Sequence, residues 1–193
     1  MRWLPTVLCL VIFGNTQAQS DPAGNYRDFP IMITLQFNAL SMPFRDITFA
    51  NPGIGLGTEL RLNGPGTAVQ QFQLIWYRNR NTGNGITLQT QSVWRPTMGK
   101  NGFGELKLGL GYLISRRPSK AFESKGGTWI SRGRKGKGML TIPLAVGAGW
   151  VQDGDRYSTA TFAGYQFMLL NNYSKSIPLV PATFVQAGVR IHQ

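Results

Sequence analysis

The sequence predicts an all-β protein, an eight-stranded antiparallel transmembrane up-and-down β-barrel, on three observations. Eight segments of the 193-residue chain alternate apolar residues with small or polar ones, the period of a strand whose two faces meet different surroundings. Short and long links alternate between these segments. Beyond residue 18 no apolar run is long enough for a membrane-spanning helix, and a closed barrel is the other arrangement that pairs all backbone groups inside a bilayer.

The first four expected strands cover residues 29–38, 54–62, 71–77 and 86–95. One side of each alternation is mainly apolar, and we expect that side to face lipid. Its members are Phe29, Ile31, Ile33, Leu35 and Phe37, then Ile54, Leu56, Thr58, Leu60 and Leu62, then Phe72, Leu74 and Trp76, and finally Ile86, Leu88, Thr90, Ser92 and Trp94.

The last four expected strands cover residues 103–112, 140–150, 157–168 and 185–192. The first two of these flank the longest link, which indicates one large β-hairpin. In the other two, the outward side chains are predicted to be Thr159, Thr161, Ala163, Tyr165, Phe167, Val185, Ala187, Val189 and Ile191. Pro143 has no N–H to donate within its strand, so we expect a bulge or a local water beside it.

Links of two lengths separate the strands. Turn-forming residues at 63–66, 98–101 and 152–155 indicate tight connections, whereas 41–51, 78–85, 115–138 and 171–181 are longer. Short turns in the periplasm and long loops outside are typical of outer-membrane barrels. We therefore expect both chain ends on the periplasmic side.

The start of the chain indicates a secretory signal. Arg2 precedes an apolar run that ends near Phe13, and small residues follow up to Ala18. We expect a cleaved signal peptide at 1–18, a periplasmic lead-in at 19–28 and the barrel domain at 29–193. The single cysteine, Cys9, falls within the signal, so disulfides are excluded from the mature chain.

The chain is strongly basic, with 20 Lys and Arg against 8 Asp and Glu and a net charge of +12. A basic protein often binds nucleic acid, but a secretory signal argues against that partner. An anionic lipid surface is the better counterpart.

The alternating strands and the link pattern resemble those of small eight-stranded bacterial outer-membrane proteins, such as the OmpA membrane domain and the OmpX and OmpW groups. The last eight residues, Gln186 to Gln193, are similar to the C-terminal assembly signal of those proteins, although they usually end on an aromatic residue. The resemblance implies this fold and a location in the cell outer membrane. The competing fold is a soluble lipocalin-type barrel, whose apolar faces would turn inward.

Charged side chains on the inward faces should gather at the periplasmic end of the lumen. Strand direction places six of them there: Glu59, Arg61, Arg95, Glu105, Lys107 and Arg190. We expect an ion-paired plug at that end, either purely structural or gating a path for a small solute. Glycine and other small residues in the outer half predict a shallower crevice that opens to the outside.

The longest link carries most of the excess charge. Its cations are Arg116, Arg117, Lys120, Lys125, Arg132, Arg134, Lys135 and Lys137, against the single acid Glu123. Cations beside a membrane favour anionic lipid phosphates, so lipopolysaccharide is the predicted partner. A solvated loop with no dedicated partner is the alternative.

Catalysis is not expected. The only histidine, His192, lies beside the C-terminus, and no serine–histidine–acid set can form at the outer side. We find no motif for a cofactor or a metal. The sequence favours a structural or surface-interaction protein, and an accessory subunit with an outer-membrane protein partner is the second interpretation. A narrow channel for small solutes and a soluble lipocalin-like ligand binder are the alternatives.

Overall fold

The chain forms a closed antiparallel β-barrel in a computed structural model, which describes residues 29–39, 49, 51–79, 83–116, 121–125, 128–133, 136–153, 158–173 and 178–192. Eight strands build its wall: β1 (Ile31–Ala39), β2 (Pro52–Arg61), β3 (Ala68–Tyr77), β4 (Asn84–Trp94), β6 (Gly102–Arg116), β9 (Gly136–Asp153), β10 (Ser158–Asn171) and β11 (Leu179–His192). Each pairs with its sequence neighbours in the wall, and pairing of β1 with β11 joins the two ends of the chain. The predicted eight-stranded fold is confirmed.

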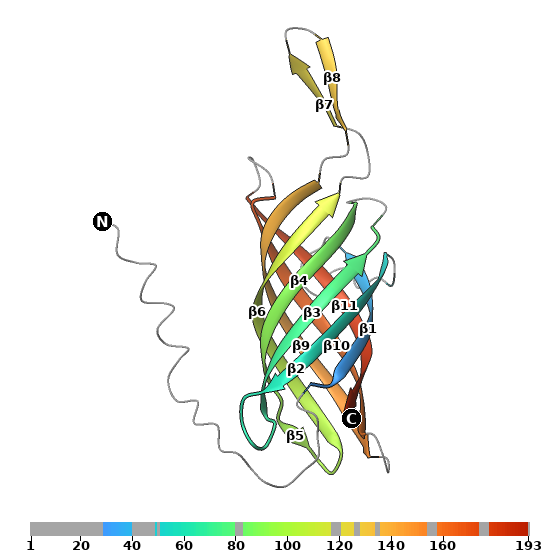
Figure 1. Cartoon of the computed structure of the whole chain (residues 1–193), viewed down its shortest axis with the longest axis vertical. Coiled ribbons are helices and arrows are strands. Elements are labelled where there is room, and N and C mark those ends of the chain that lie inside the picture. The colour runs from blue at the N-terminus through green and yellow to red at the C-terminus, as the bar shows by residue number, and fades with distance from the viewer. Residues whose placement is uncertain are drawn as a thin grey trace, which may run out of the picture.

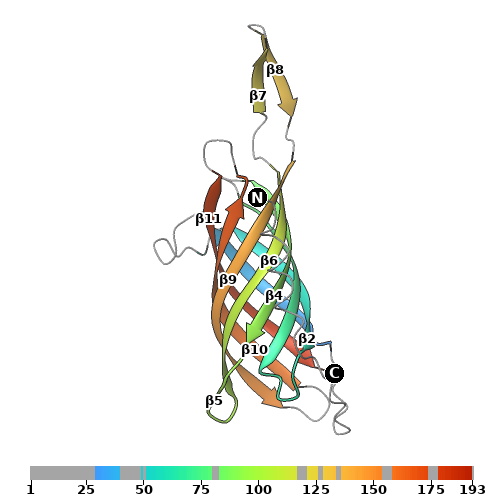
Figure 2. The ribbon, with the colours of Figure 1, turned by 90° about the vertical axis from the view of Figure 1, so that its left-hand side faces the viewer.

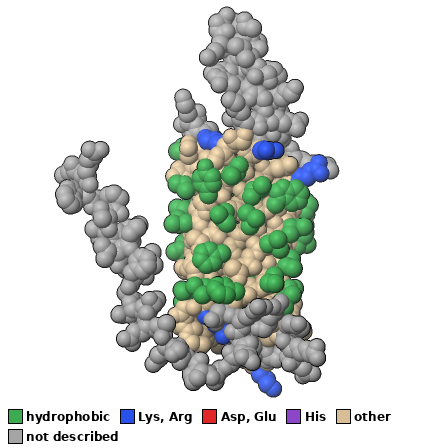
Figure 3. Space-filling model, in the orientation of Figure 1, with side chains coloured by type: hydrophobic (Ala, Val, Ile, Leu, Met, Phe, Trp, Pro, Cys, Tyr) green, Lys and Arg blue, Asp and Glu red, His purple; other side chains and the backbone are tan. Residues whose placement is uncertain are grey.

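The wall has the orientation predicted for a membrane protein. Alternate side chains on every strand face outward, where they are exposed or half-buried and mainly apolar; Ile33, Leu74, Leu88 and Leu108 are examples. Figure 3 shows hydrophobic side chains over the wall, with Lys and Arg near its two ends. The opposite faces are buried and carry Gln, Thr and charged groups. The soluble lipocalin-like alternative is therefore wrong, because it requires the reverse arrangement. The outward phase predicted for 159–167 is confirmed: Ala160, Phe162, Gln166 and Met168 are the buried set.

In the described part of the chain, no helix is long and apolar enough to cross a membrane.

The two ends of the barrel differ as the link lengths predicted. One end, called here the inner end, carries the 62–67 turn, the short strand β5 (Thr97–Met98) and the C-terminal residue of β11 (Figures 1 and 2). The longer links leave the other, outer end. The expected signal and lead-in, residues 1–28, lie outside the described residues, as does most of the 41–51 link.

The longest link was predicted as a loop and is instead partly a second hairpin. Strands β7 (Ala121–Lys125) and β8 (Thr128–Gly133) pair in a sheet of their own and lie beyond the outer ends of β6 and β9 (Figure 2). The pairing of Lys125 with Thr128 leaves a two-residue connection, Gly126-Gly127. This dipeptide is a hairpin-turn signal that the sequence analysis passed over.

Pro143 interrupts the wall without the predicted bulge. Strands β6 and β9 keep one register throughout, since Leu108 pairs with Leu144 and Gly111 with Thr141. The two intervening pairs, Gly109–Pro143 and Leu110–Ile142, do not form. On its other side Pro143 pairs normally with Met168 of β10. A missing proline N–H therefore opens the ladder on one side only and shifts no residue.

Candidate functional site

The inner part of the lumen holds a cluster of five charged side chains. Glu59 comes from β2, Glu105 and Lys107 from β6, and Arg190 from β11, while Arg95 directly follows the last residue of β4. All five project inward because each continues the phase of the inward face of its strand. Glu59, Glu105, Lys107 and Arg190 are at least 97% buried. Five of the six residues predicted for the lumenal charge network therefore meet.

The two carboxylates of this lumenal cluster are shared between three cations. Arg95 binds both, with Nη2 2.8 Å from Glu59 Oε1 and Nε 2.8 Å from Glu105 Oε1. Arg190 does the same, at 2.7 Å to each carboxylate. Lys107 Nζ lies 3.0 Å from Glu105 Oε2 and donates to Gln71 Oε1 at 3.1 Å. The cluster links four of the eight wall strands across the lumen.

Two phenylalanine rings complete the lumenal cluster, and the sequence analysis did not find them. The Arg190 guanidinium lies 4.0 Å from the ring centroid of Phe162 and 5.6 Å from that of Phe103. Phe103 fills the space where Gly149 has no side chain, and Phe162 does the same at Gly188. A Cβ at either glycine would collide with the ring. The signal was present, since Phe103 is in phase with Glu105 and Lys107.

Arg61 does not join the buried group. It is exposed at the inner end of β2, in the last residue pair of the β2–β3 ladder. His192 is half-buried at the last residue of β11, at the inner end as predicted. Among the described residues no three His, Cys, Asp or Glu side chains are placed to hold a metal ion.

A layer of amides fills the middle of the lumen. Gln89 of β4 and Gln166 of β10 exchange hydrogen bonds across the barrel at 3.3 and 3.1 Å. Gln89 also donates to Gln73 at 3.0 Å, and Gln73 donates to Thr34 at 2.9 Å. The lumen-facing Gly55 leaves room for these side chains, since a Cβ there would meet Gln73, Gln36 and Thr34.

The outer part of the lumen is filled mainly by apolar side chains, so the predicted open crevice is wrong. Its buried hydrophobic residues are Ile75, Tyr77, Leu113, Met139, Met168, Leu170, Val180, Ala182 and Phe184. The rings of Tyr77 and Phe184 meet edge to face, with centroids 5.5 Å apart. The crevice was inferred from small residues on single strands, but large side chains from neighbouring strands occupy the space.

The eight predicted lipid-binding cations are described only in part. Arg116 is exposed at the outer end of β6, opposite Gly136 of β9. Lys137 Nζ donates to the Tyr173 carbonyl oxygen at 2.9 Å, which ties the start of β9 to the link after β10. Lys125 and Arg132 belong to β7 and β8, and their side chains lie outside the described part, as do Arg117, Lys120, Arg134 and Lys135.

A closed wall, an apolar exterior and a filled lumen with buried ion pairs and amides define an eight-stranded transmembrane β-barrel of the outer-membrane class. Among solved structures the fold is similar to that of Neisserial surface protein A, with a TM-score of 0.60 and 11% identity over 87% of this chain and 99% of that one. It is also similar to Ail, the attachment invasion locus protein of Yersinia pestis, with a TM-score of 0.50 and 10% identity over 86% of this chain and 97% of that one. The likeness is one of fold. No family model and no curated protein matches the chain.

Proposed function

We propose that this protein is a non-enzymatic outer-membrane barrel that uses its basic outer segment, residues 116–137, to bind the phosphates of lipopolysaccharide. The observation that carries the proposal is the placement of this segment. Strand β6 ends and strand β9 begins at the end of the barrel opposite the C-terminus, and strands β7 and β8 of this segment lie beyond that end (Figure 1). Eight cations and one acid occupy this part of the sequence.

The filling of the lumen supports a binding role over a transport role. Ion pairs, amides and apolar side chains occupy it at three successive levels. An eight-stranded barrel has an interior just wide enough for such side chains. We therefore place the function on the surface of the protein. The outer segment holds eight Lys and Arg residues, more than any other link in the sequence.

The test is the amount of lipopolysaccharide that remains with the protein after extraction from native membranes in mild detergent. We expect replacement of Arg132, Arg134, Lys135 and Lys137 by glutamine to remove most of it, because each cation near an anionic surface contributes about 1 kcal/mol. The loss should be mimicked by high salt, which screens exposed charges.

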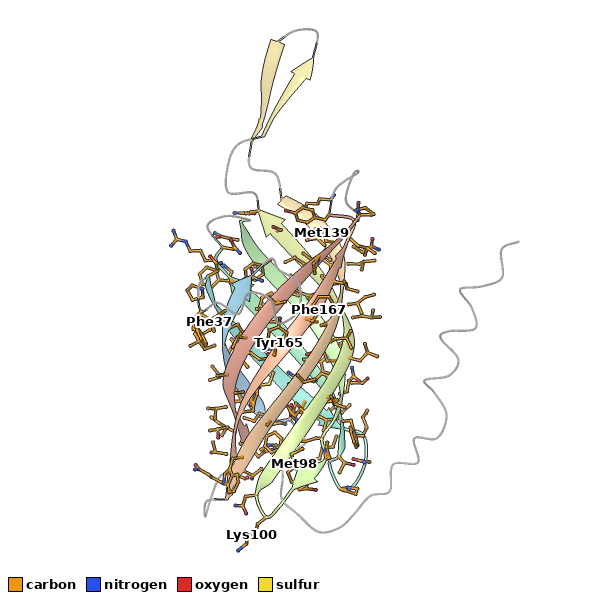
Figure 4. The ribbon with its side chains drawn as sticks, turned by 180° about the vertical axis from the view of Figure 1, so that it is seen from behind. Phe37, Met98, Lys100, Met139, Tyr165 and Phe167 are labelled. Atoms are coloured by element: carbon orange, nitrogen blue, oxygen red, sulfur yellow. The ribbon has the colours of Figure 1, made fainter. Side chains whose placement is uncertain are left out.

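Lys100→Gln is the matched control, since Lys100 is exposed in the inner-end turn near Met98 (Figure 4). Equal retention by the fourfold variant and the wild type would contradict the proposal. Recovery of a stoichiometric protein partner in its place would support the accessory-subunit role instead.

A further inference from the structure

An apolar groove lies on the outside of the wall, across strands β3, β4, β6, β9 and β10. It has a volume of about 740 Å³, and its lining is almost entirely apolar. Leu62, Ala68 and Trp94 line it beside the inner-end turns. Tyr165 and Phe167 line it between the two ends of the barrel (Figure 4). The groove therefore begins at the inner rim and ends part of the way along the wall.

The groove has the depth of one lipid leaflet. Trp94 and Trp150 face outward and are exposed, and such tryptophans mark the interface between membrane and water. Trp150 pairs with Thr161, and Phe167 follows Thr161 by six residues of β10, about 20 Å of strand at 3.3 Å per residue. With a strand tilt of about 40°, Phe167 lies about 15 Å from that interface. This is half of a hydrocarbon core about 30 Å thick, so the groove ends near the midplane.

A second cavity adjoins the groove at the inner rim. It has a volume of about 250 Å³ and lies between the 62–67 turn and the turn that joins β4 to β6. On β3 and β4 the lining of the groove ends at Ala68 and Trp94. The lining of the second cavity begins at the next residues, Thr67 and Arg95, where Arg95 N donates to Thr67 O at 2.7 Å. A molecule in the groove can therefore reach the cavity by passing over the rim of one strand pair.

The second cavity has the chemistry of an anion site. Its lining includes the cations Arg95 and Lys100 and the hydroxyls of Thr67 and Thr97, and the described residues around it include no Asp or Glu. Arg95 belongs to the lumenal cluster, in which three cations share two carboxylates, so a net positive charge remains beside the cavity. Guanidinium and ammonium groups both bind phosphate.

We infer that the groove and the second cavity bind one phospholipid of the inner leaflet, with an acyl chain in the groove and the phosphate in the cavity. The inference goes beyond the proposed function, because it uses neither the outer segment nor lipopolysaccharide. The two cavities favour this occupant, since an apolar groove one leaflet deep leads to a cationic site at the rim. A second copy of the chain, packed through the same face, would leave the cationic site without an anion.

Polar side chains on the outer face lie where the head and the chains of such a lipid join. Ser92 lines the groove two positions from Trp94, and its hydroxyl donates to Gln70 Oε1 at 2.9 Å. Gln70 Nε2 donates to Thr90 Oγ1 at 2.6 Å, and its amide has a second N–H. A polar group that faces lipid is costly without a partner. An ester carbonyl supplies an acceptor that acyl chains lack.

Photoreactive phosphatidylglycerols test the inference with refolded protein in phosphatidylcholine vesicles. One probe carries its reactive group beside the ester and the other at the chain end, and the crosslinked peptides are identified by mass spectrometry. We expect the first probe to label the inner-end residues around Trp94 and the second to label β10 around Phe167. Labelling by the first probe at the outer ends of β6 and β9 would overturn the inference.

Val146→Trp fills the groove and should lower the yields of both probes at least threefold. Ile33→Trp is the matched control, because Ile33 is a lipid-facing aliphatic residue on β1, outside the groove. It should leave both yields unchanged. Equal losses from the two tryptophans would overturn the inference, as would a dimer that Val146→Trp abolishes, since a second copy would then be the occupant.

Lys100→Glu tests the cationic site separately. It reverses a charge in the lining of the second cavity and should lower the phosphatidylglycerol yields at least twofold. Matching phosphatidylcholine probes, whose head is neutral overall, should be unaffected. Equal yields for the two lipids in the wild type, or equal losses for both in Lys100→Glu, would overturn the assignment of the phosphate to the cavity. Neither outcome bears on lipopolysaccharide retention, so failure here is distinguishable from failure of the proposed function.

Discussion

The inner and outer parts of the lumen are both occupied by buried side chains, but these side chains have opposite chemistry. At the inner end three cations, Arg95, Lys107 and Arg190, share the carboxylates of Glu59 and Glu105. At the outer end nine apolar side chains pack around Tyr77 and Phe184. Both ends are packed with buried side chains, yet different physical interactions stabilise the two packings.

The difference concerns what happens when one side chain is lost. The stability of an ion-paired cluster depends on every charge having a partner, because an unpaired charge left in a desolvated site lowers the free energy of unfolding. An apolar cluster depends on volume, since a truncated side chain costs its transfer free energy and leaves a cavity. Substitutions at the two ends should therefore differ in size and in their response to conservative replacement.

The largest effect is expected for Glu105→Gln. This carboxylate contacts Arg95, Lys107 and Arg190, so its neutralisation leaves three cations around the single charge of Glu59. We expect the free energy of unfolding to fall by about 3–5 kcal/mol, measured by urea unfolding in detergent micelles.

Lys100→Gln changes one exposed charge and should shift the free energy of unfolding by less than about 0.5 kcal/mol. Glu105→Asp keeps the charge and should recover part of the loss. A Glu105→Gln variant as stable as the wild type would show that the ion pairs at the inner end contribute nothing.

Phe184→Ala is expected to have the next largest effect. Phe184 is fully buried in the outer cluster and its ring meets that of Tyr77. Removal of the ring should lower the free energy of unfolding by about 3 kcal/mol. Phe184→Leu, which keeps most of the volume, should cost less than half of this, whereas no conservative neutral residue rescues Glu105. Equal losses for the alanine and leucine variants would contradict a volume-based account of this end.

Between the two ends, Pro143→Val should stabilise the protein slightly. Valine supplies the N–H that the β6–β9 ladder lacks, and one added hydrogen bond contributes about 1 kcal/mol. Urea unfolding again provides the measurement. Pro52→Val is the control, because Pro52 is the first residue of β2 and its pairing with Phe37 is intact. A destabilised Pro143→Val variant would show that the proline is held there by packing.

The sequence predicted most of the fold. Of the two ends compared here, it predicted the composition of the inner one. Period-2 alternation and strand direction were enough to bring Glu59 and Glu105 together with Arg95 and Arg190, because phase fixes the face and direction fixes the depth. Arg61 was placed wrongly by the same reasoning, because it lies in the last pair of the β2–β3 ladder, where its side chain is exposed at the inner rim.

The packing of the lumen beyond the ion pairs could not be inferred in the same way. Gly55 looked like empty space on its own strand, yet Gln36 and Gln73 of neighbouring strands fill the position. The side chain that fills a gap is determined by the register between neighbouring strands. A single sequence indicates that register only through its turn residues. The hairpin β7–β8 went unpredicted for a different reason: the dipeptide Gly126-Gly127 favours a hairpin, but the many cations around it favour a solvated loop.

The smallest expected effect is on ion conduction, which tests whether each end of the lumen blocks ions on its own. Glu59→Gln weakens only the inner end, and Phe184→Ala weakens only the outer end. Because either filled end blocks the lumen, each single variant should stay closed in planar bilayers, as the wild type should. The double variant weakens both ends and should show brief openings, leaving the amide layer around Gln89 and Gln166 as the remaining obstacle. Heat-modifiable mobility on a gel confirms beforehand that each variant is folded. Steady conductance from Glu59→Gln alone would mean that the apolar outer end does not seal the barrel, and would restore the narrow-channel reading in which the ion pairs act as the gate.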